Sequence, residues 1–277
     1  MKLLNKLSEN RLVGGIVTKV ITGRVNQEID AIADHFQQYL KPIYATNSQL
    51  KDDSYRIRHE VYCEELKFEE MRANQLEQDE FDAYSQACII QHKPSKDFAG
   101  TVRVVSPERH DQPLPIEKYC SEVFRHSSVK PSDFKYSEVS EISRLAILPH
   151  FRRRKSDHFK GSETGAINEK TFSTQEMRCF PFISIGLYLA AASTTIDSGR
   201  HHVFVMMEPR LARSMALVGI RFKQIGDPIE YHGTRAPYYI SSKIFFDSLP
   251  NGFLKLHNII QDSLKAQHSQ LKLQSTG

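Results

Sequence analysis

The sequence predicts an α/β domain of three layers, with helices on both faces of a central mixed sheet. Two short apolar segments, at residues 87–90 and 99–105, have the composition of strands and are separated by a polar turn. A regular series of helix, strand and helix follows between residues 182 and 219. Because strands both precede and follow helices, this order favours an α/β architecture.

The composition limits the classes of protein that need to be considered. At 277 residues with 40% hydrophobic side chains, the chain can build one catalytic domain with extensions. The net charge of +4 is mild, and the basic residues are scattered apart from a run at residues 152–155. A dedicated nucleic-acid-binding protein would concentrate such residues, so we expect no nucleic-acid partner.

The cysteines and the apolar segments indicate a cytoplasmic location. No C-x-x-C pair occurs, so we expect reduced thiols rather than disulfides or a zinc site. The N-terminus lacks the long apolar core of a secretory signal. The most apolar run, residues 180–196, is short and rich in Ser and Thr, which predicts a core helix rather than a membrane span. The cysteines are Cys63, Cys88, Cys120 and Cys179.

The first part of the chain predicts a helical extension and then the start of the domain. Residues 27–40 carry apolar side chains at helical spacing, so residues 1–43 are expected to form an extension that could also touch a membrane surface. A strand at residues 41–45 follows, after which Asn47 or Ser48 caps a helix. The apolar stripe of that helix consists of Leu50, Ser54, Ile57 and Val61.

The domain itself is predicted to extend over residues 44–248. A short helix is expected around residues 116–124 and a long strand over residues 138–148. Residues 155–175 are polar and rich in Gly, Ser and Thr, which predicts a mobile insertion.

Helices and strands alternate in the rest of the chain. A helix at residues 182–197 ends before Gly199, and a second helix starts at Pro209 and stops at Gly219. Residues 249–277 are expected to form a C-terminal helix and tail. The strands predicted here are 202–207, 222–225 and 238–246, and the terminal helix is 258–270.

The most informative segment is Glu138–Pro149, EVSEISRLAILP, because it sets polar side chains inside an otherwise buried strand. Strand alternation places Glu141 and Ser143 on one face and Arg144 on the other. A buried Glu is costly unless it is paired or used. Glu141 is therefore either half of a structural ion pair or an acid–base group in a cleft. The face of Glu141 is predicted to include Val139, Leu145 and Ile147.

Short motifs of charged and aromatic residues follow one another along the chain: Arg58-x-x-Val61-Tyr62, Phe68, Asp79-x-x-Asp82, Arg103 and Glu141-x-Ser143-Arg144. In this order they resemble the acyl-homoserine-lactone synthases and the long-chain N-acyl amino acid synthases, which share the GNAT-type acyltransferase fold. The resemblance implies a three-layer α-β-α domain with a mixed, mostly antiparallel sheet.

Further segments narrow the resemblance: Arg72-Ala73-Asn74, Phe151-Arg152-Arg153-Arg154 and Glu230-Tyr231-His232-Gly233-x-Arg235-x-Pro237-Tyr238. They look typical of a bacterial subfamily, the exosortase-associated or PEP-CTERM-associated acyltransferases. The resemblance covers residues 44–248 and leaves out both ends of the chain.

The resemblance assigns roles to the carboxylates of these motifs. Glu141, with Ser143 beside it, would take the proton of an amine that attacks a thioester. Asp79 and Asp82 would hold the ammonium group of this acceptor. The alternatives are structural, namely an ion pair of Glu141 with an arginine and two solvated Asp residues in a turn.

The arginines and the last hairpin have two interpretations as well. Arg58 and Arg103 either clamp an acceptor carboxylate or neutralise the acids, and either could be the structural partner of Glu141. Arg144 is expected to brace the other layer. Tyr231 and His232 are further candidates for substrate binding, and His232 is the second candidate base although a lone His is more often structural.

The segment after residue 145 predicts how the acyl donor binds. The glycine-rich loop that cradles a pyrophosphate in this fold is absent, because no Gly occurs until Gly161. This favours a donor on the phosphopantetheine of an acyl carrier protein over acyl-coenzyme A. Met215 replaces a Tyr that protonates the leaving thiolate in many relatives. The backbone N–H groups expected to stabilise the oxyanion are those of Ala146, Ile147 and Leu148. The positive charges expected either to attract the negatively charged acyl donor or to form only a solvated loop are Arg152, Arg153 and Arg154.

The sequence therefore predicts an N-acyltransferase that moves a fatty acyl group from acyl carrier protein to the amine of an amino acid or a similar small acceptor. No permanently bound cofactor is expected, and no metal, because His201-His202 lack acidic partners at ligand spacing. Two rivals remain open: an acyl-homoserine-lactone synthase that uses S-adenosylmethionine, and a non-catalytic module that binds acyl chains or the carrier protein.

Overall fold

The computed structural model describes residues 33–125, 127–152 and 182–274. The strands in this part of the chain are β1 (Leu40–Tyr44), β2 (Ser85–His92), β3 (Phe98–Val105), β4 (Val139–Ile147), β5 (His202–Met207), β6 (Lys223–Gln224), β7 (Ile229–Glu230) and β8 (Thr234–Ser241). They form a sheet in the order β1-β2-β3-β4-β5-β8-β6, with β7 paired to β8. Among the described strands only β4 and β5 pair in parallel, which confirms a mixed and mostly antiparallel sheet.

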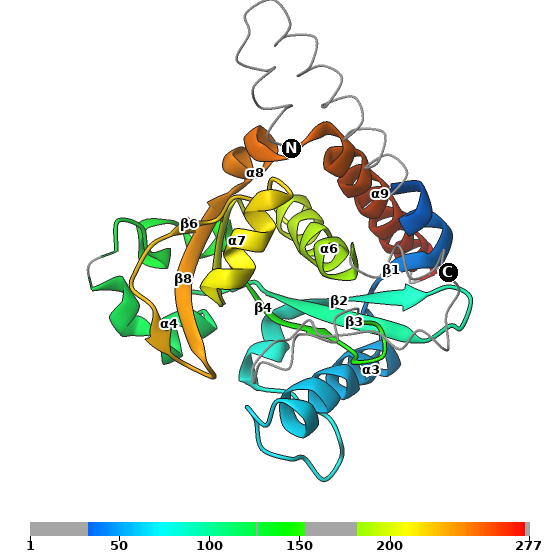
Figure 1. Cartoon of the computed structure of the whole chain (residues 1–277), viewed down its shortest axis with the longest axis horizontal. Coiled ribbons are helices and arrows are strands. Elements are labelled where there is room, and N and C mark those ends of the chain that lie inside the picture. The colour runs from blue at the N-terminus through cyan, green and yellow to red at the C-terminus, as the bar shows by residue number, and fades with distance from the viewer. Residues whose placement is uncertain (1–32, 126, 153–181, 275–277) are drawn as a thin grey trace, which may run out of the picture.

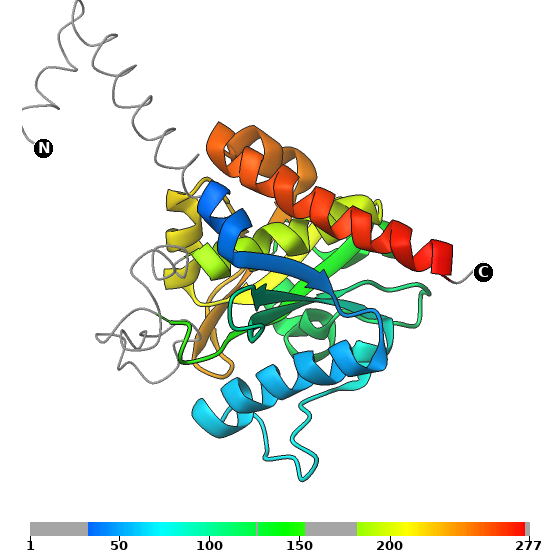
Figure 2. The same ribbon diagram turned by 90° about the vertical axis from the view of Figure 1, so that its right-hand side faces the viewer.

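Helices cover both faces of the sheet, as predicted. In Figures 1 and 2 the helix α3 lies on one face, while α6 and α9 lie on the other. Residues 33–39 are also helical. The longer helices are α3 (Ser48–Arg58), α6 (Ile183–Asp197), α7 (Pro209–Leu217), α8 (Ser242–Ser248) and α9 (Asn251–Gln274). The short ones are η1 (His59–Glu65), η2 (Glu80–Tyr84), α4 (Pro115–Tyr119), η3 (Ser121–Phe124), η4 (Pro131–Asp133) and η5 (Tyr136–Glu138).

Local signals in the sequence explain where several helices begin and end. Asn47 caps α3, because its Oδ1 accepts a hydrogen bond from the backbone N–H of Leu50 at 2.8 Å. Pro209 opens α7 at its first turn. Gly219 follows α7 with a φ of +89°, and a side chain there would collide with the carbonyl oxygen of Ser248. These three predictions are confirmed.

Two predicted boundaries are wrong at the C-terminal end. The strand expected over residues 238–246 stops at Ser241, because the Ser241 hydroxyl accepts a hydrogen bond from the N–H of Ile244 and starts helix α8 instead. Helix α9 begins at Asn251 rather than at residue 258. The expected insertion at 155–175 and Cys179 lie outside the described residues, whereas the three described cysteines are free thiols.

The main hydrophobic core lies between the sheet and α6. Phe36 from the helix at 33–39 and Leu256 and Ile260 from α9 are fully buried in this core, so both ends of the described chain pack onto the sheet. A smaller core lies on the other face, where Ile57 and Val61 pack against the sheet. The two layers of helix thereby hold the strands that carry the polar motifs.

A bulge interrupts β4 at Arg144, which has a φ of +51°. Ser143 pairs with Arg103, but Ala146 pairs with Thr101, so two residues of β4 stand opposite one residue of β3. A bulge of this kind reverses the alternation of side chains beyond it.

The bulge corrects the predicted faces of the strand. Arg144 does not brace the opposite layer but points into the same cavity as Glu141 and Ser143. Leu145 and Ile147, which alternation placed beside Glu141, lie on the opposite face and belong to the main core. Three polar side chains of one strand therefore share one cavity.

Strands β4 and β5 pair only at their beginnings. The paired residues are Val139–Glu141 of β4 and His202–Phe204 of β5. From Ile142 onward β4 is not paired with β5, although β5 itself continues to Met207 and pairs with β8 along its whole length. The two strands therefore separate next to Glu141.

Candidate active site

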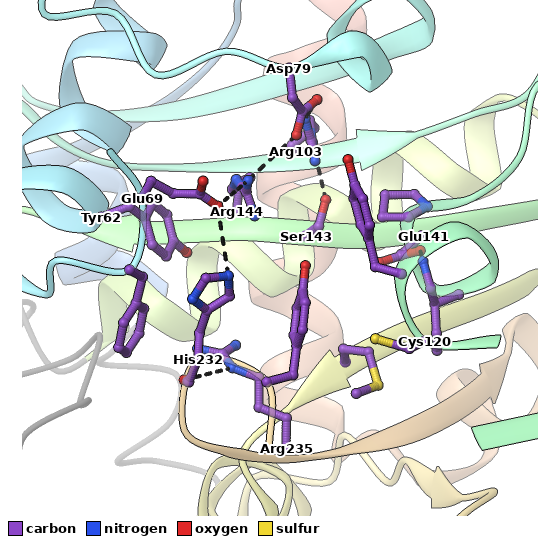
Figure 3. Close-up of a pocket in the computed structure, with 16 residues that line it drawn as sticks. Tyr62, Glu69, Asp79, Arg103, Cys120, Glu141, Ser143, Arg144, His232 and Arg235 are labelled. Carbon is purple, nitrogen blue, oxygen red and sulfur yellow. Dashed lines mark hydrogen bonds and ion pairs between the residues drawn. The ribbon is translucent and has the colours of Figure 1, made fainter. Parts of the chain in front are cut away.

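A cavity lies beside the point where β4 and β5 separate, between the loop after η1, helix α4 and the β7–β8 hairpin (Figure 3). It encloses about 610 Å³ of empty space, part of which is open to solvent, and this suits a small-molecule acceptor. The side chains that line it and that bear on its chemistry are Tyr62, Phe68, Glu69, Asp79, Arg103, Cys120, Glu141, Ser143, Arg144, Tyr231, His232 and Arg235.

Glu141 is the most deeply buried carboxylate of the cavity, with 3% of the residue exposed. Its Oε2 accepts a hydrogen bond from the backbone N–H of Ile116 at 2.8 Å. Burial raises the pKa of Glu141 to about 8, against the opposing effects of this hydrogen bond and of Arg103. Within the described residues Glu141 forms no ion pair with Arg58 or Arg103, so the structural alternative from the sequence is not realised there.

Arg58 is fully buried behind the cavity and neutralises acids. Its Nη1 and Nη2 bind the two carboxylate oxygens of Asp82 at 2.7 and 3.0 Å, and its Nε binds Glu77. Burial opposes the ionisation of Asp82, but Arg58 and Arg103 outweigh it and lower the pKa of Asp82 to about 2. Neither Arg58 nor Asp82 lines the cavity, so this Asp is neither a solvated turn residue nor placed to meet an acceptor.

Asp79 and Arg103 lie at the cavity wall and bind each other. Asp79 caps η2 and accepts a hydrogen bond from Arg103 Nη1 at 2.5 Å. The Nε of Arg103 donates to the hydroxyl of Ser143 at 3.1 Å. Ser143 is thereby fixed beside Glu141 on the same strand, and Figure 3 shows its hydroxyl turned toward Arg103.

Arg144 connects the cavity to the buried acids. Its Nη2 lies 2.7 Å from Glu69 Oε1, 3.1 Å from Glu77 and 3.5 Å from Asp79. The left-handed backbone at the bulge is what aims this side chain at the acids. Its guanidinium also lies 5.5 Å from the centre of the Tyr62 ring.

The β7–β8 hairpin forms the wall opposite Asp79, as Figure 3 shows for His232 and Arg235. The ring of His232 packs against Phe68 at a centroid distance of 5.3 Å, and its Nε2 lies 3.9 Å from Glu69 Oε1. His232 has a φ of +52°. Tyr231 lines the cavity next to it, and its pKa is raised to about 12 by burial.

The residues expected to meet the acyl donor are only partly placed to do so. The N–H of Leu148 points toward β3, because it donates a hydrogen bond to the carbonyl of Ala99 at 3.0 Å. Since the N–H groups of successive residues in an antiparallel strand point in opposite directions, the N–H of Ile147 faces the gap toward β5. Arg152 is buried and is bound to Glu65 and to the carbonyl of Ile147, so its charge is not displayed at the mouth of the site.

Two further positions bear on the expected donor site. Arg153 and Arg154 lie outside the described residues. Met215, in the place of the thiolate-protonating Tyr, is buried in the main core and does not line the cavity.

Sequence reasoning missed two carboxylates of the site, Glu69 and Glu77. Glu77 is 1% exposed and bridges Arg58 and Arg144. A signal was available, because several buried arginines need a matching set of carboxylates and Glu77 stands two residues before Asp79. Within the described residues, no group of three His, Cys, Asp or Glu side chains is arranged to hold a metal ion.

Comparison with known families identifies the class of the domain. Residues 57–159 match the family model described as an acetyltransferase (GNAT) domain. This range includes the cavity residues of η1, β3 and β4. The chain is thus an enzyme of the acyltransferase class. No significant match to a curated protein was found.

Solved structures with a similar fold include two acyl-homoserine-lactone synthases and the protein TofI. The AHL synthase LasI matches with a TM-score of 0.53 and 13% identity, covering 76% of this chain and 95% of LasI. TofI, in a complex with an inhibitor and MTA, matches with a TM-score of 0.54 and 12% identity, covering 77% and 99%. The CoA-dependent acyl-homoserine lactone synthase BjaI, with SAM and isopentyl-CoA, gives 0.51 and 17%, covering 80% and 89%.

At such low identity the likeness shows a shared fold. The match to the GNAT domain model, together with the mixed and mostly antiparallel sheet, confirms the predicted GNAT-type architecture. In the part of the chain that the structure describes, no helix combines the length and the apolar character needed to cross a bilayer.

Proposed function

We propose that this enzyme transfers a fatty acyl group from a carrier-bound thioester, with acyl carrier protein as the preferred donor, to the amine of an amino acid or a similar small acceptor. The observation that supports this most strongly is Glu141, a buried carboxyl with a pKa of about 8 at the wall of a cavity. A general base works best when its pKa is close to the working pH. Glu141 meets this condition, whereas Asp82 does not.

The proposed reaction starts with an acceptor that enters as an ammonium ion. Ionised Glu141 takes one proton from it, directly or through a water molecule, and the freed amine attacks the carbonyl carbon of the thioester. A C–N bond forms, the tetrahedral intermediate collapses, and the C–S bond breaks. The net reaction converts ammonium and thioester into amide and thiol and releases one proton. Because a thiol is a good leaving group, the chemistry does not depend on an acid at the position of Met215.

The gap between β4 and β5 is the proposed site of the thioester. Its edge carries the N–H of Ile147, which would stabilise the developing oxyanion. The absence of a glycine-rich loop after β4 supports a carrier-protein donor over acyl-coenzyme A, because such a loop would cradle a pyrophosphate. A link to PEP-CTERM systems, a cytoplasmic location and a peripheral membrane contact remain predictions from the sequence.

The test compares lipid extracts, by mass spectrometry, from host cells that express the wild type and the Glu141→Gln variant. We expect an amide-linked acyl product with the wild type and at least a hundredfold less with the variant. The product also names the acyl chain and the acceptor. Equal amounts of product from both proteins would remove Glu141 from the mechanism.

A second candidate is acyl-homoserine-lactone synthesis, because LasI and BjaI share the fold. Products separate the two activities: this rival releases a lactone and methylthioadenosine from S-adenosylmethionine, whereas the proposed reaction releases a linear N-acyl product.

A further inference from the structure

Helix α7 turns a basic face to solvent. Its inner face, with Ala212 and Met215, packs into the main core. On the outer face, Arg210, Arg213 and Leu217 follow one another at spacings of three and four residues, which places them on one side of the helix. Both arginines are exposed, and Leu217 is 88% exposed. The described part of the chain therefore leaves this face of α7 open to solvent.

The basic character continues beyond the helix and is not balanced within its own segment. Arg221 and Lys223, which follow α7, are also exposed. Residues 209–226 contain four basic side chains and no acidic one, although the whole chain has 33 acids against 37 bases. Within the described residues, neither Arg213 nor Arg221 forms an ion pair with a carboxylate. We call this region of positive charge the α7 surface; it consists of Arg210, Arg213, Leu217, Arg221 and Lys223.

The α7 surface lies at the open end of the gap between β4 and β5. The two strands are paired as far as Glu141 and Phe204 and not beyond. Strand β5 continues to Met207, and α7 starts two residues later at Pro209, on the same side of the sheet as α6 (Figure 1). The nine residues of α7 extend only about 14 Å from this point. A protein that docks on α7 therefore stands directly beside the proposed site of the thioester.

We propose that the α7 surface docks an acidic acyl carrier protein, whose phosphopantetheine arm then enters the gap between β4 and β5. The inference rests on the proposed acyl transfer for the identity of the partner. It assigns the attraction of the carrier to α7 instead of the basic run at residues 152–155, where Arg152 is buried against Glu65. Complementary charge speeds and orients such docking. The position beside the gap favours this partner over an anionic membrane, which delivers no thioester.

The binding test titrates the purified full chain with dodecanoyl acyl carrier protein in a calorimeter, which needs no acceptor. We expect Arg213→Glu to weaken binding about tenfold, because repulsion replaces attraction, and Arg213→Glu/Arg221→Glu to weaken it further. Raising the ionic strength to about 0.5 M should weaken wild-type binding as well. Dodecanoyl-pantetheine, which reaches the gap without a docked protein, should bind the wild type and Arg213→Glu equally. Lys51→Glu, the same change of charge at an exposed position of α3, is the matched control.

The outcomes separate this inference from the proposed function. Binding of the carrier protein that Arg213→Glu leaves unchanged, or that Lys51→Glu weakens equally, would overturn the α7 surface. So would Arg213-dependent binding of anionic phospholipid vesicles by a protein that binds no carrier protein. Docking that depends on Arg213, without acyl transfer to any amino acid, would keep the surface and refute the proposed reaction. Transfer from acyl carrier protein at the wild-type rate by Arg213→Glu/Arg221→Glu would keep the reaction and refute the surface.

Discussion

Two buried carboxylates, Asp82 and Glu141, lie in neighbouring parts of this enzyme and have opposite proton affinities. Asp82 sits beside Arg58 and Arg103 between α3 and β3, where burial is outweighed by two guanidinium groups and the pKa falls to about 2. Glu141 sits on β4 against α4, where burial dominates and the pKa rises to about 8. Its direct partner is a backbone N–H group rather than an arginine.

The difference shows that burial alone does not decide what a carboxylate does. Arg58 pairs with both Asp82 and Glu77, and the arginines lower the pKa values of these two acids against the effect of burial. The ion pairs of Asp82 with Arg58 and Arg103 also tie helix α3 and η2 to the sheet. Glu141 receives little compensation, so its proton can be exchanged near neutral pH. Pairs of groups whose pKa values are pushed apart in this way are the places to look for acid–base chemistry.

The largest effect on stability should come from breaking the ion pairs that Arg58 makes with Glu77 and Asp82. Arg58→Met leaves Glu77 and Asp82 buried without their main partner, and we expect the free energy of unfolding to fall by about 3–5 kcal/mol. The control is Arg56→Met on the same helix, where the Arg56–Asp53 pair is half exposed and should matter by less than about 0.5 kcal/mol. Denaturant titration at neutral pH measures both, and equal effects would show that the ion pairs of Arg58 do not anchor the fold.

Removing the proton-accepting carboxylate of Glu141 tests its proposed role in acyl transfer. Glu141→Gln keeps an oxygen for the N–H of Ile116 but cannot take a proton, so acyl transfer should fall about a hundredfold or more. Glu138→Gln, with an exposed carboxylate just before the same strand, should transfer at the wild-type rate. Product formation by purified protein is the measurement. Similar losses in the two variants would point to a general effect of charge.

Glu141→Gln should also make the protein more stable than the wild type, and this difference should grow as the pH rises. The folded wild type keeps Glu141 protonated up to about pH 8, whereas the unfolded chain ionises it near the ordinary value of 4.5. Between these values the unfolded state binds fewer protons, so wild-type stability falls with rising pH. Glu141→Gln escapes this loss and should exceed the wild type by about 1–3 kcal/mol at pH 8. Unfolding curves at pH 5 and pH 8 measure it, and a gap that does not widen contradicts the shift.

A smaller effect is expected at Ser143, which lies on the strand of Glu141 and is hydrogen-bonded to Arg103. Ser143→Ala removes the hydroxyl that accepts a hydrogen bond from Arg103, which should cost about 0.5–1.5 kcal/mol in stability or in transition-state binding. Ser140→Ala is a control on the same strand, since the Ser140 hydroxyl is buried and has no hydrogen-bond partner in the described residues. A comparison of kcat/KM and unfolding free energy for both variants decides whether Ser143 acts on catalysis.

Much of the fold could be predicted because its signals are local. Asn47, Pro209 and Gly219 mark helix ends through their own backbone chemistry, and the strands follow from short apolar runs. The wrong boundary at Ser241 also has a local cause, a side-chain cap that competes with strand continuation in an apolar segment. The apolar composition of this segment does not show whether the cap or the strand prevails.

The candidate site was less predictable because its geometry depends on tertiary structure. The bulge at Arg144 has no Gly or Asn to announce it, so alternation assigned Arg144 to the wrong face. Glu69 and Glu77 lie in a loop without periodicity, and only the folded chain shows that they meet the arginines. Arg152 looked like part of a surface charge run, yet it is buried against Glu65.

The most direct test of this account is an NMR titration of the side-chain carboxyl carbons of ¹³C-labelled glutamate and aspartate in the wild type and in Glu141→Gln. It needs no substrate and no assumption about the reaction. We predict one wild-type glutamate resonance that titrates near pH 8 and is missing from the variant, while Glu77 titrates below its ordinary value and Asp82 titrates near pH 2. A Glu141 resonance that titrates near its ordinary value of 4.5 would contradict the central claim that burial reserves this carboxyl for proton transfer.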